Sequence, residues 1–156
     1  MGPVRRRDIL RAQGPVRRKS VLMLLTLDFE TFAIQNRPDY PPEPVGVSLK
    51  RGDAPSHYLS WGHPDGNNCT REEAVAEMQA LWADESIEVL CHHAKFDMAV
   101  AYEKLGLPVL PWNRVHDTML LLFLADPHSK SLALKDAAAR YLDMPPDEQE
   151  ALHGRL

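Results

Sequence analysis

The chain has 156 residues, of which 44% are hydrophobic, and its formal net charge at pH 7 is −4. This length suits one domain, which would bury about 70% of the surface that the unfolded chain exposes. Two cysteines in a chain of this length exclude a disulfide scaffold, and the apolar content excludes disorder over most of the sequence. The longest apolar runs, 21–25 and 119–125, are far shorter than the roughly 20 residues of a membrane span, so we expect no membrane partner.

Charge is unevenly distributed along the chain. Residues 1–20 carry a net charge of +6, whereas residues 21–156 carry −10. The basic segment contains the motif Gly-Pro-Val-Arg-Arg twice and has no apolar stretch on which to fold. We therefore expect a flexible N-terminal arm over 1–20, with a nucleic-acid contact as the alternative, and a folded domain over 21–156. The sequence has no apolar secretory segment, so the cytoplasm is the expected location.

The first part of the folded domain reads as three strands. They are expected at 21–27, 45–49 and 56–61. The first is a nearly unbroken apolar run, typical of a strand covered on both faces, and it leads into Asp28-Phe29-Glu30-Thr31. A proline-rich loop over 37–44 separates it from the other two, which form a hairpin that turns at Gly52.

The second part alternates helices with strands. Helices are expected at 71–82, 94–105, 117–124 and 131–142, and strands at 87–91 and near 115–116. Thr70 and Glu73 form a capping box, and Asp117 and Ser131 are expected to cap the last two helices. This order predicts an α/β fold: a mixed sheet of three antiparallel strands and then two parallel ones, flanked by helices.

Asp28 and Glu30 are the first candidates for chemistry. They stand two residues apart at the carboxyl end of the central strand, so the strand period of two places both carboxylates on one face, opposite Phe29. Ligands of open α/β sheets bind just beyond the carboxyl ends of strands. Two carboxylates held close repel each other unless a cation lies between them, and such oxygen ligands favour Mg²⁺ or Mn²⁺. The alternative is a pair of exposed acids where a strand meets a loop.

Two further acids follow later strands. Asp97 lies in the first turn of the helix that begins after His92-His93, near the same edge of the sheet. An acid there also complements the helix dipole without any further role. Phe96 fits the core better than a base-stacking surface, and capping alone explains Asp117.

Together these motifs resemble a known family. The ordered set Asp28-Phe29-Glu30-Thr31, His-x-x-Phe-Asp at 93–97, His-Asp-Thr-Met-Leu-Leu at 116–121 and Ser-Leu-x-x-x-Ala-Ala-x-Tyr-Leu near the end is similar to the 3′–5′ exonuclease domain of DNA polymerase I, in its phage-type form. That domain belongs to the DEDD superfamily, which has a ribonuclease H-like sheet. The resemblance covers about residues 21–143.

The resemblance implies roles for particular residues. Asp28, Glu30 and Asp97 match the catalytic acids that hold two metal ions, Mg²⁺ or Mn²⁺, in the complete domain. Thr31 and Ile34 match positions that contact the terminal nucleotide, and His93 matches a polar contact near the scissile bond. Phe96 is the fourth candidate for substrate binding. His93 stands where the family usually has asparagine, so it keeps a hydrogen-bond donor but adds a titratable ring. The implied activity is proofreading-type removal of nucleotides from the 3′ end of single-stranded DNA during replication, with release of nucleoside 5′-monophosphates.

One expected motif of the family does not fit the sequence. The third motif is Tyr-x-x-x-Asp or His-x-x-x-x-Asp, but Pro145 follows Tyr141 by four positions and Ala133 follows His128 by five. We therefore expect a domain that is incomplete at its C-terminus, with weak or no turnover by the isolated chain. A polymerase or a companion chain would supply the third motif. The alternatives are an inactive exonuclease-like module that binds nucleic acid or a partner, and a zinc protein that uses Cys91, His92, His93 and His116.

Overall fold

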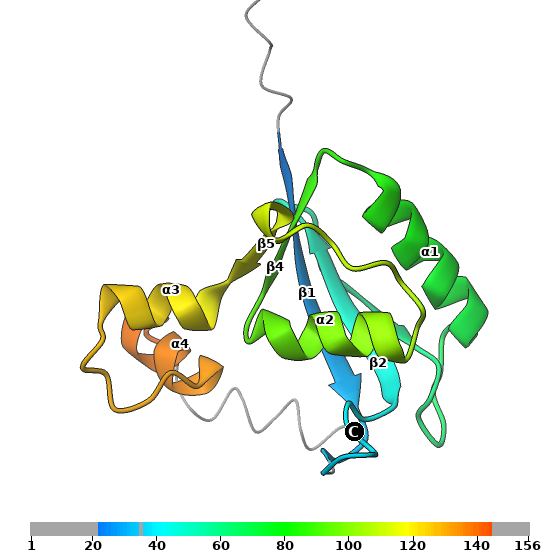
Figure 1. Cartoon of the computed structure of the whole chain (residues 1–156), viewed down its shortest axis with the longest axis horizontal. Coiled ribbons are helices and arrows are strands. Elements are labelled where there is room, and N and C mark those ends of the chain that lie inside the picture. The colour runs from blue at the N-terminus through cyan, green and yellow to red at the C-terminus, as the bar shows by residue number, and fades with distance from the viewer. Residues whose placement is uncertain (1–21, 35, 145–156) are drawn as a thin grey trace, which may run out of the picture.

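The computed structural model describes residues 22–34 and 36–144, and Figure 1 shows their arrangement. The expected basic arm over 1–20 and the polar tail over 147–156 lie outside these residues. The elements follow in the order β1 (Met23–Thr31), β2 (Pro44–Arg51), β3 (His57–Ser60), α1 (Arg71–Ala83), β4 (Ile87–Cys91), α2 (Ala94–Glu103), the 3₁₀ helix η2 (Trp112–Arg114), β5 (Val115–Asp117), α3 (Thr118–Ala125) and α4 (Leu134–Leu142).

The strands form one mixed sheet in the order β3-β2-β1-β4-β5. The pairs β1–β2 and β2–β3 are antiparallel, whereas β4 runs parallel to β1 and β5 runs parallel to β4. The α/β fold with three antiparallel and then two parallel strands is therefore confirmed. β1 is the central strand, so its residues lie between the antiparallel hairpin and the parallel half of the sheet.

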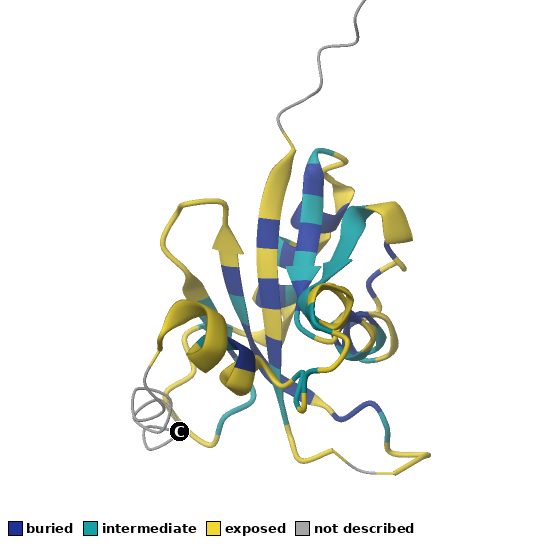
Figure 2. Ribbon diagram, turned by 90° about the vertical axis from the view of Figure 1, so that its left-hand side faces the viewer, coloured by how far each residue is buried: buried dark blue, intermediate teal, exposed yellow. Residues whose placement is uncertain are grey.

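One face of the sheet carries the hydrophobic core. Along β1 buried and exposed residues alternate, which Figure 2 shows as alternating bands on the central strand. The buried side chains of β1, Leu25, Leu27 and Phe29, belong to one cluster with residues of both α1 and α2. These two helices therefore cover the same face, and the other face of β1 presents Leu24, Thr26 and Asp28 as exposed residues. A period of two thus separates the core from the face that bears Asp28.

The capping box at α1 is formed as predicted. Thr70 Oγ1 accepts a hydrogen bond from Glu73 N, and Glu73 Oε2 accepts one from Thr70 N. Thr70→Ala is expected to lower the free energy of unfolding by about 1 kcal/mol, because one N–H at the helix start loses its acceptor. Chemical denaturation measures this loss. Thr70→Ser, which keeps the hydroxyl, is the matched control, and equal losses in both variants would contradict a capping role.

Several element boundaries differ from the prediction, and three of the differences have a clear physical reason. β1 continues to Thr31 because β2 pairs with it over its whole carboxyl half. α2 ends at Glu103, ahead of Gly106, whose φ of +67° favours glycine. α4 begins only at Leu134, so the prediction that Ser131 caps it was wrong. Ser131 instead accepts a hydrogen bond from Ala133 N in the turn that precedes the helix.

α3 and α4 lie apart from the two core helices, beyond the β5 edge of the sheet (Figure 1). Both expose large apolar side chains, Leu124 (74% exposed) and Leu142 (68%) most of all. Among the described residues, no helix combines the length and the apolar character that crossing a membrane requires.

Candidate active site

The candidate site is created by a difference in strand length. β4 pairs with β1 only over Met23–Thr26, whereas β2 pairs with β1 as far as Thr31. On the β4 side, the carboxyl half of β1 therefore has no neighbouring strand to accept its N–H groups. The side chain of Asp97 takes that place: its Oδ1 accepts a hydrogen bond of 3.3 Å from Phe29 N. Asp97 thus closes the gap between the two strands at their carboxyl ends, where α/β sheets bind ligands.

Asp28 and Glu30 lie on one face of β1, opposite the buried Phe29, as the spacing predicts. Burial raises the pKa of Asp28, and the nearby His92 partly counteracts this rise. Glu30 pairs with Gly46 on β2. Its negative charge also contributes to the raised pKa of Tyr58 on β3. His92, which follows β4, thus affects Asp28, whereas Glu30 affects Tyr58 of the hairpin.

Asp97 is the most perturbed acid of the site. It is 1% exposed, and its pKa is raised to about 7. Burial is the largest cause; the negative charge of Asp28 adds to it, and the hydrogen bond from Phe29 N opposes it. The charge of Asp28 therefore makes ionisation of Asp97 harder. A cation at the site would relieve this repulsion.

The residues fit a hard divalent cation in donor chemistry, because Asp28 and Asp97 offer carboxylate oxygens in a partly desolvated place. Over 22–34 and 36–144, however, no three side chains from His, Cys, Asp and Glu converge to hold a metal ion. The charge of Asp28 acts on Asp97, and the third predicted acid, Glu30, lies on the same strand and face as Asp28. That these three acids hold metal ions stays a prediction.

The same finding argues against the zinc hypothesis. The ring of His92 contacts Thr118 Oγ1 through Nδ1 (2.8 Å) and Leu132 O through Nε2 (3.0 Å), so both nitrogens have other partners. His116 Nε2 lies 2.7 Å from a carboxylate oxygen of Glu88. Burial strongly raises the pKa of the Cys91 thiol, which disfavours the thiolate that zinc requires.

Asp117 caps two helices rather than the single one predicted. Its Oδ1 accepts hydrogen bonds from Met119 N (2.9 Å), at the start of α3, and from His93 N (3.0 Å). Its Oδ2 accepts one from Ala94 N (2.9 Å), the first residue of α2. Capping thus explains Asp117, as expected. The second cap could not be read from the sequence, since it depends on β5 lying beside β4.

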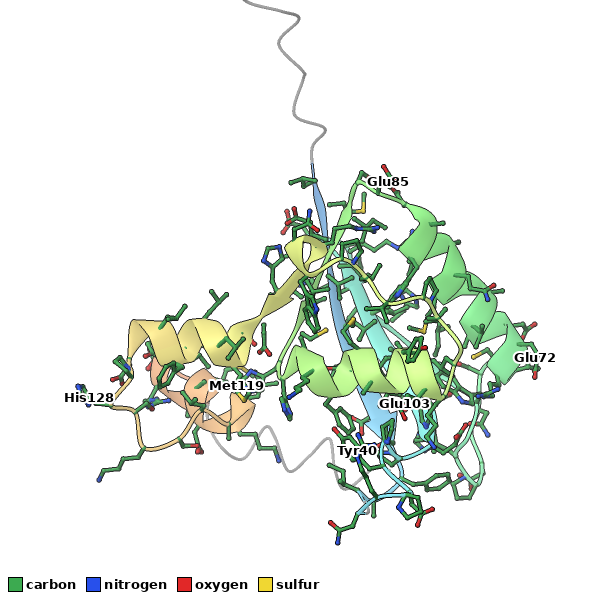
Figure 3. All side chains as sticks on the ribbon, in the orientation of Figure 1. Tyr40, Glu72, Glu85, Glu103, Met119 and His128 are labelled. Carbon is green, nitrogen blue, oxygen red and sulfur yellow. The ribbon has the colours of Figure 1, made fainter. Side chains whose placement is uncertain are left out.

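The residues expected to contact a nucleotide lie on two segments around Asp97. His93, in the left-handed conformation with φ of +72°, stacks on Phe96 with 6.4 Å between ring centroids and 18° between planes. Phe96 packs partly against the core, as predicted, and also contacts Tyr40, which Figure 3 shows in the loop below α2.

On the other segment, Thr31 Oγ1 donates to Phe32 O, and Ile34 is 65% exposed. The structure adds two groups that sequence reasoning missed: the exposed Phe32 and the side chain of Tyr58. Only the pairing of β3 with β2 brings Tyr58 to this face, so no local signal pointed to it.

Comparison with known proteins gives one related sequence and several related structures. The chain is 30% identical over 123 residues to the DNA polymerase of Escherichia phage T5. The aligned residues make up 77% of this chain and 13% of the polymerase. No protein-family model matches this chain. Among solved structures, NrnC of Brucella melitensis is 20% identical with a TM-score of 0.58 and covers 78% of this chain and 52% of its own. NrnC has also been solved with bound Mg²⁺ and with pGG.

Escherichia coli RNase D, described as an exoribonuclease involved in structured RNA processing, is 20% identical with a TM-score of 0.54 and covers 78% of this chain and 28% of its own. The chain therefore spans about half or less of the length of each of these proteins. The polymerase match and these structural neighbours agree with the order of the motifs and with the sheet that carries them. In sequence the chain resembles part of a phage DNA polymerase, and in fold it resembles NrnC and RNase D, in agreement with the resemblance to a 3′–5′ exonuclease domain of the DEDD type.

Proposed function

We propose that the chain is a metal-dependent 3′–5′ exonuclease module of the proofreading type, which hydrolyses the 3′-terminal phosphodiester bond of single-stranded DNA. The observation that supports this most is that Asp28 and Asp97 meet at the carboxyl end of β1, where burial raises the pKa of both and the charge of Asp28 raises that of Asp97 further. The relation to a phage DNA polymerase favours DNA as the substrate. The Mg²⁺ complex of NrnC favours Mg²⁺ or Mn²⁺ as the cofactor.

Each residue has a distinct task in this reaction. Asp28 and Asp97 would hold the metal ions, which when bound neutralise the phosphate and activate water. Glu30, on the same face of β1 as Asp28, would be the third acid of this group. The His93–Phe96 stack and the exposed Ile34 offer apolar surfaces for the terminal nucleotide. Protein groups thus serve chiefly to position the strand and the water.

The acidic body does not oppose this function. A strand that is held at its end needs a narrow site with a few stacking side chains rather than a wide basic surface. The two acids at the site would instead attract the cations that accompany the phosphates. The third exonuclease motif would come from a polymerase or a companion chain, since neither Tyr141 nor His128 has an aspartate at the family's spacing.

The test is an assay of the isolated chain on a 5′-labelled single-stranded DNA oligonucleotide with Mn²⁺. We expect slow shortening from the 3′ end in the wild type and none in Asp28→Ala. Asp136→Ala, which removes an exposed acid at the start of α4, is the control and should shorten the DNA as the wild type does. Equal shortening in the Asp28→Ala variant would contradict the proposal.

A binding module without activity is the second candidate, favoured by the missing spacing of the third motif. It predicts that the oligonucleotide binds equally well with and without a chelator and is never shortened. The exonuclease predicts binding that a chelator weakens, because the metal ions would connect the carboxylates to the phosphate. Fluorescence anisotropy of the labelled strand distinguishes the two.

A further inference from the structure

A cavity adjoins the candidate site on the hairpin side. It lies between β3 and the loop that follows, has a volume of about 370 Å³, and is lined by Tyr58, Ser60, His63, Pro64, Asp65, Gly66 and Asn68. This volume falls within the range of small-molecule sites in proteins. Its walls combine two aromatic rings with polar groups, which is the chemistry of a site for a base with its sugar.

The loop of this cavity is fixed by two asparagine side chains. Asn67 accepts from His63 N (3.0 Å) and donates to His63 O (2.8 Å). Asn68 accepts from Ser60 N (2.9 Å) and donates to Tyr58 O (2.6 Å). Gly66 has φ of +71°, a conformation that favours glycine. The cavity is therefore held in shape before any ligand arrives, which lowers the entropic cost of binding.

Tyr58 forms the wall that the cavity shares with the carboxylate face. Its hydroxyl lies 2.7 Å from His63 Nε2, and the two rings are 5.9 Å apart at 55°. The hydroxyl also lies directly over Gly46, since a Cβ added there would be 2.1 Å from Tyr58 Oη. Gly46 is the residue that pairs with Glu30. The absence of a side chain at position 46 thus lets Tyr58 reach across β2 toward Glu30.

We propose that this cavity binds one nucleotide of the substrate strand, next to the nucleotide whose phosphodiester bond is cut at Asp28 and Asp97. The inference rests on the proposed function, because the carboxylates place the scissile bond. Gly46 pairs with both Glu30 and Ser60. Since neighbouring strands are about 4.8 Å apart, Ser60 lies about 10 Å from Glu30 across the sheet. Two consecutive nucleotides of an extended strand cover such a span.

The lining residues would have separate roles in this subsite. The ring of Tyr58 or His63 provides a face on which a base stacks, and such stacking tolerates any base. Asp65, at the rim, can accept a hydrogen bond from a sugar hydroxyl or a base amino group. Burial and the charge of Glu30 raise the pKa of Tyr58 to about 12, so its hydroxyl keeps its proton at neutral pH.

The test compares two ligands by calorimetry in the presence of Ca²⁺: thymidine 5′-monophosphate and 5′-phosphorylated dithymidylate with a phosphorothioate linkage that slows hydrolysis. The whole chain is expected to bind the dinucleotide about tenfold more tightly than the mononucleotide, because one more base is stacked. His63→Ala should reduce this ratio to about one and leave mononucleotide binding unchanged. Tyr58→Ala should also reduce the ratio to about one. Tyr102→Ala, which removes an exposed tyrosine on α2, is the matched control and should keep the tenfold ratio.

Circular dichroism shows whether each variant folds. If Tyr58→Ala does not fold, His63→Ala alone tests the subsite. Two results would overturn the subsite: a ratio that stays tenfold in a folded His63→Ala chain, or a ratio of one in the wild type. The proposed function would still stand in either case if the wild-type chain shortens DNA from its 3′ end. A ratio that depends on His63, found in a chain that does not shorten DNA, supports the subsite and favours the binding module over the exonuclease. Binding of neither ligand overturns the subsite.

Discussion

Asp97→Asn is expected to stabilise the fold at neutral and alkaline pH while removing any 3′-end trimming. The folded chain raises the pKa of Asp97 from 3.8 to about 7, so the folded state holds this proton more tightly than the unfolded state. The contribution of Asp97 to stability is therefore most favourable below about pH 4, falls as the pH rises to about 7, and is then lower by about 4 kcal/mol, a value obtained from the pKa difference. Asparagine carries no charge at any of these pH values, and its side-chain oxygen can still accept from Phe29 N.

Urea denaturation of wild type and variant between about pH 4 and pH 8 measures this effect. The free energies of unfolding should agree at the acidic end and diverge toward pH 8, with the variant more stable. Asp136→Asn, at an exposed acid, should follow the wild type over the whole range. Mg²⁺ should reduce the difference by stabilising the wild type alone. If the free energies of unfolding of wild type and variant differ by the same amount at every pH, ionisation of the buried Asp97 does not destabilise the fold.

Asp117→Ala is expected to lower the free energy of unfolding by about 2–4 kcal/mol, because two helix caps are lost together. Three N–H groups, those of His93, Ala94 and Met119, lose the carboxylate that accepts their hydrogen bonds. For a chain of this size, such a loss lowers the melting temperature by about 10 °C. Thermal unfolding followed by circular dichroism gives the shift.

Asp117→Asn serves as the control for this prediction. Its side chain keeps one acceptor oxygen of the two, so its loss should fall between the wild type and the alanine variant. A loss below about 1 kcal/mol for alanine would mean that Asp117 caps only one helix effectively.

The sequence predicted the sheet because its signals were local. The apolar run before Asp28, the capping box of Thr70 and the glycine after α2 each act within one element, and the order of elements restricted the topology. The shared face of Asp28 and Glu30 followed from the strand period alone.

The rest depended on contacts between distant segments. The extra length of β1 beyond β4 decides that Phe29 N needs the side chain of Asp97, and no local pattern shows where a neighbouring strand ends. Tyr58 reaches Glu30 only because Gly46 lies between them on β2. For Ser131 a local signal was present but misleading. Serine is common at helix caps, yet here its side chain stabilises the turn before the helix.

The alternation along β1 has a consequence for how this domain can change. Leu25, Leu27 and Phe29 are packed in the core with the helices, whereas Asp28, between the last two, faces the site. Repacking the core can therefore alter thermal tolerance with little effect on the chemistry of the opposite face, and the reverse also holds. Asp97 is the exception, because it is buried like a core residue and yet interacts with Asp28. Adaptation of the fold and of the site would thus be largely independent, and they would conflict at that one position.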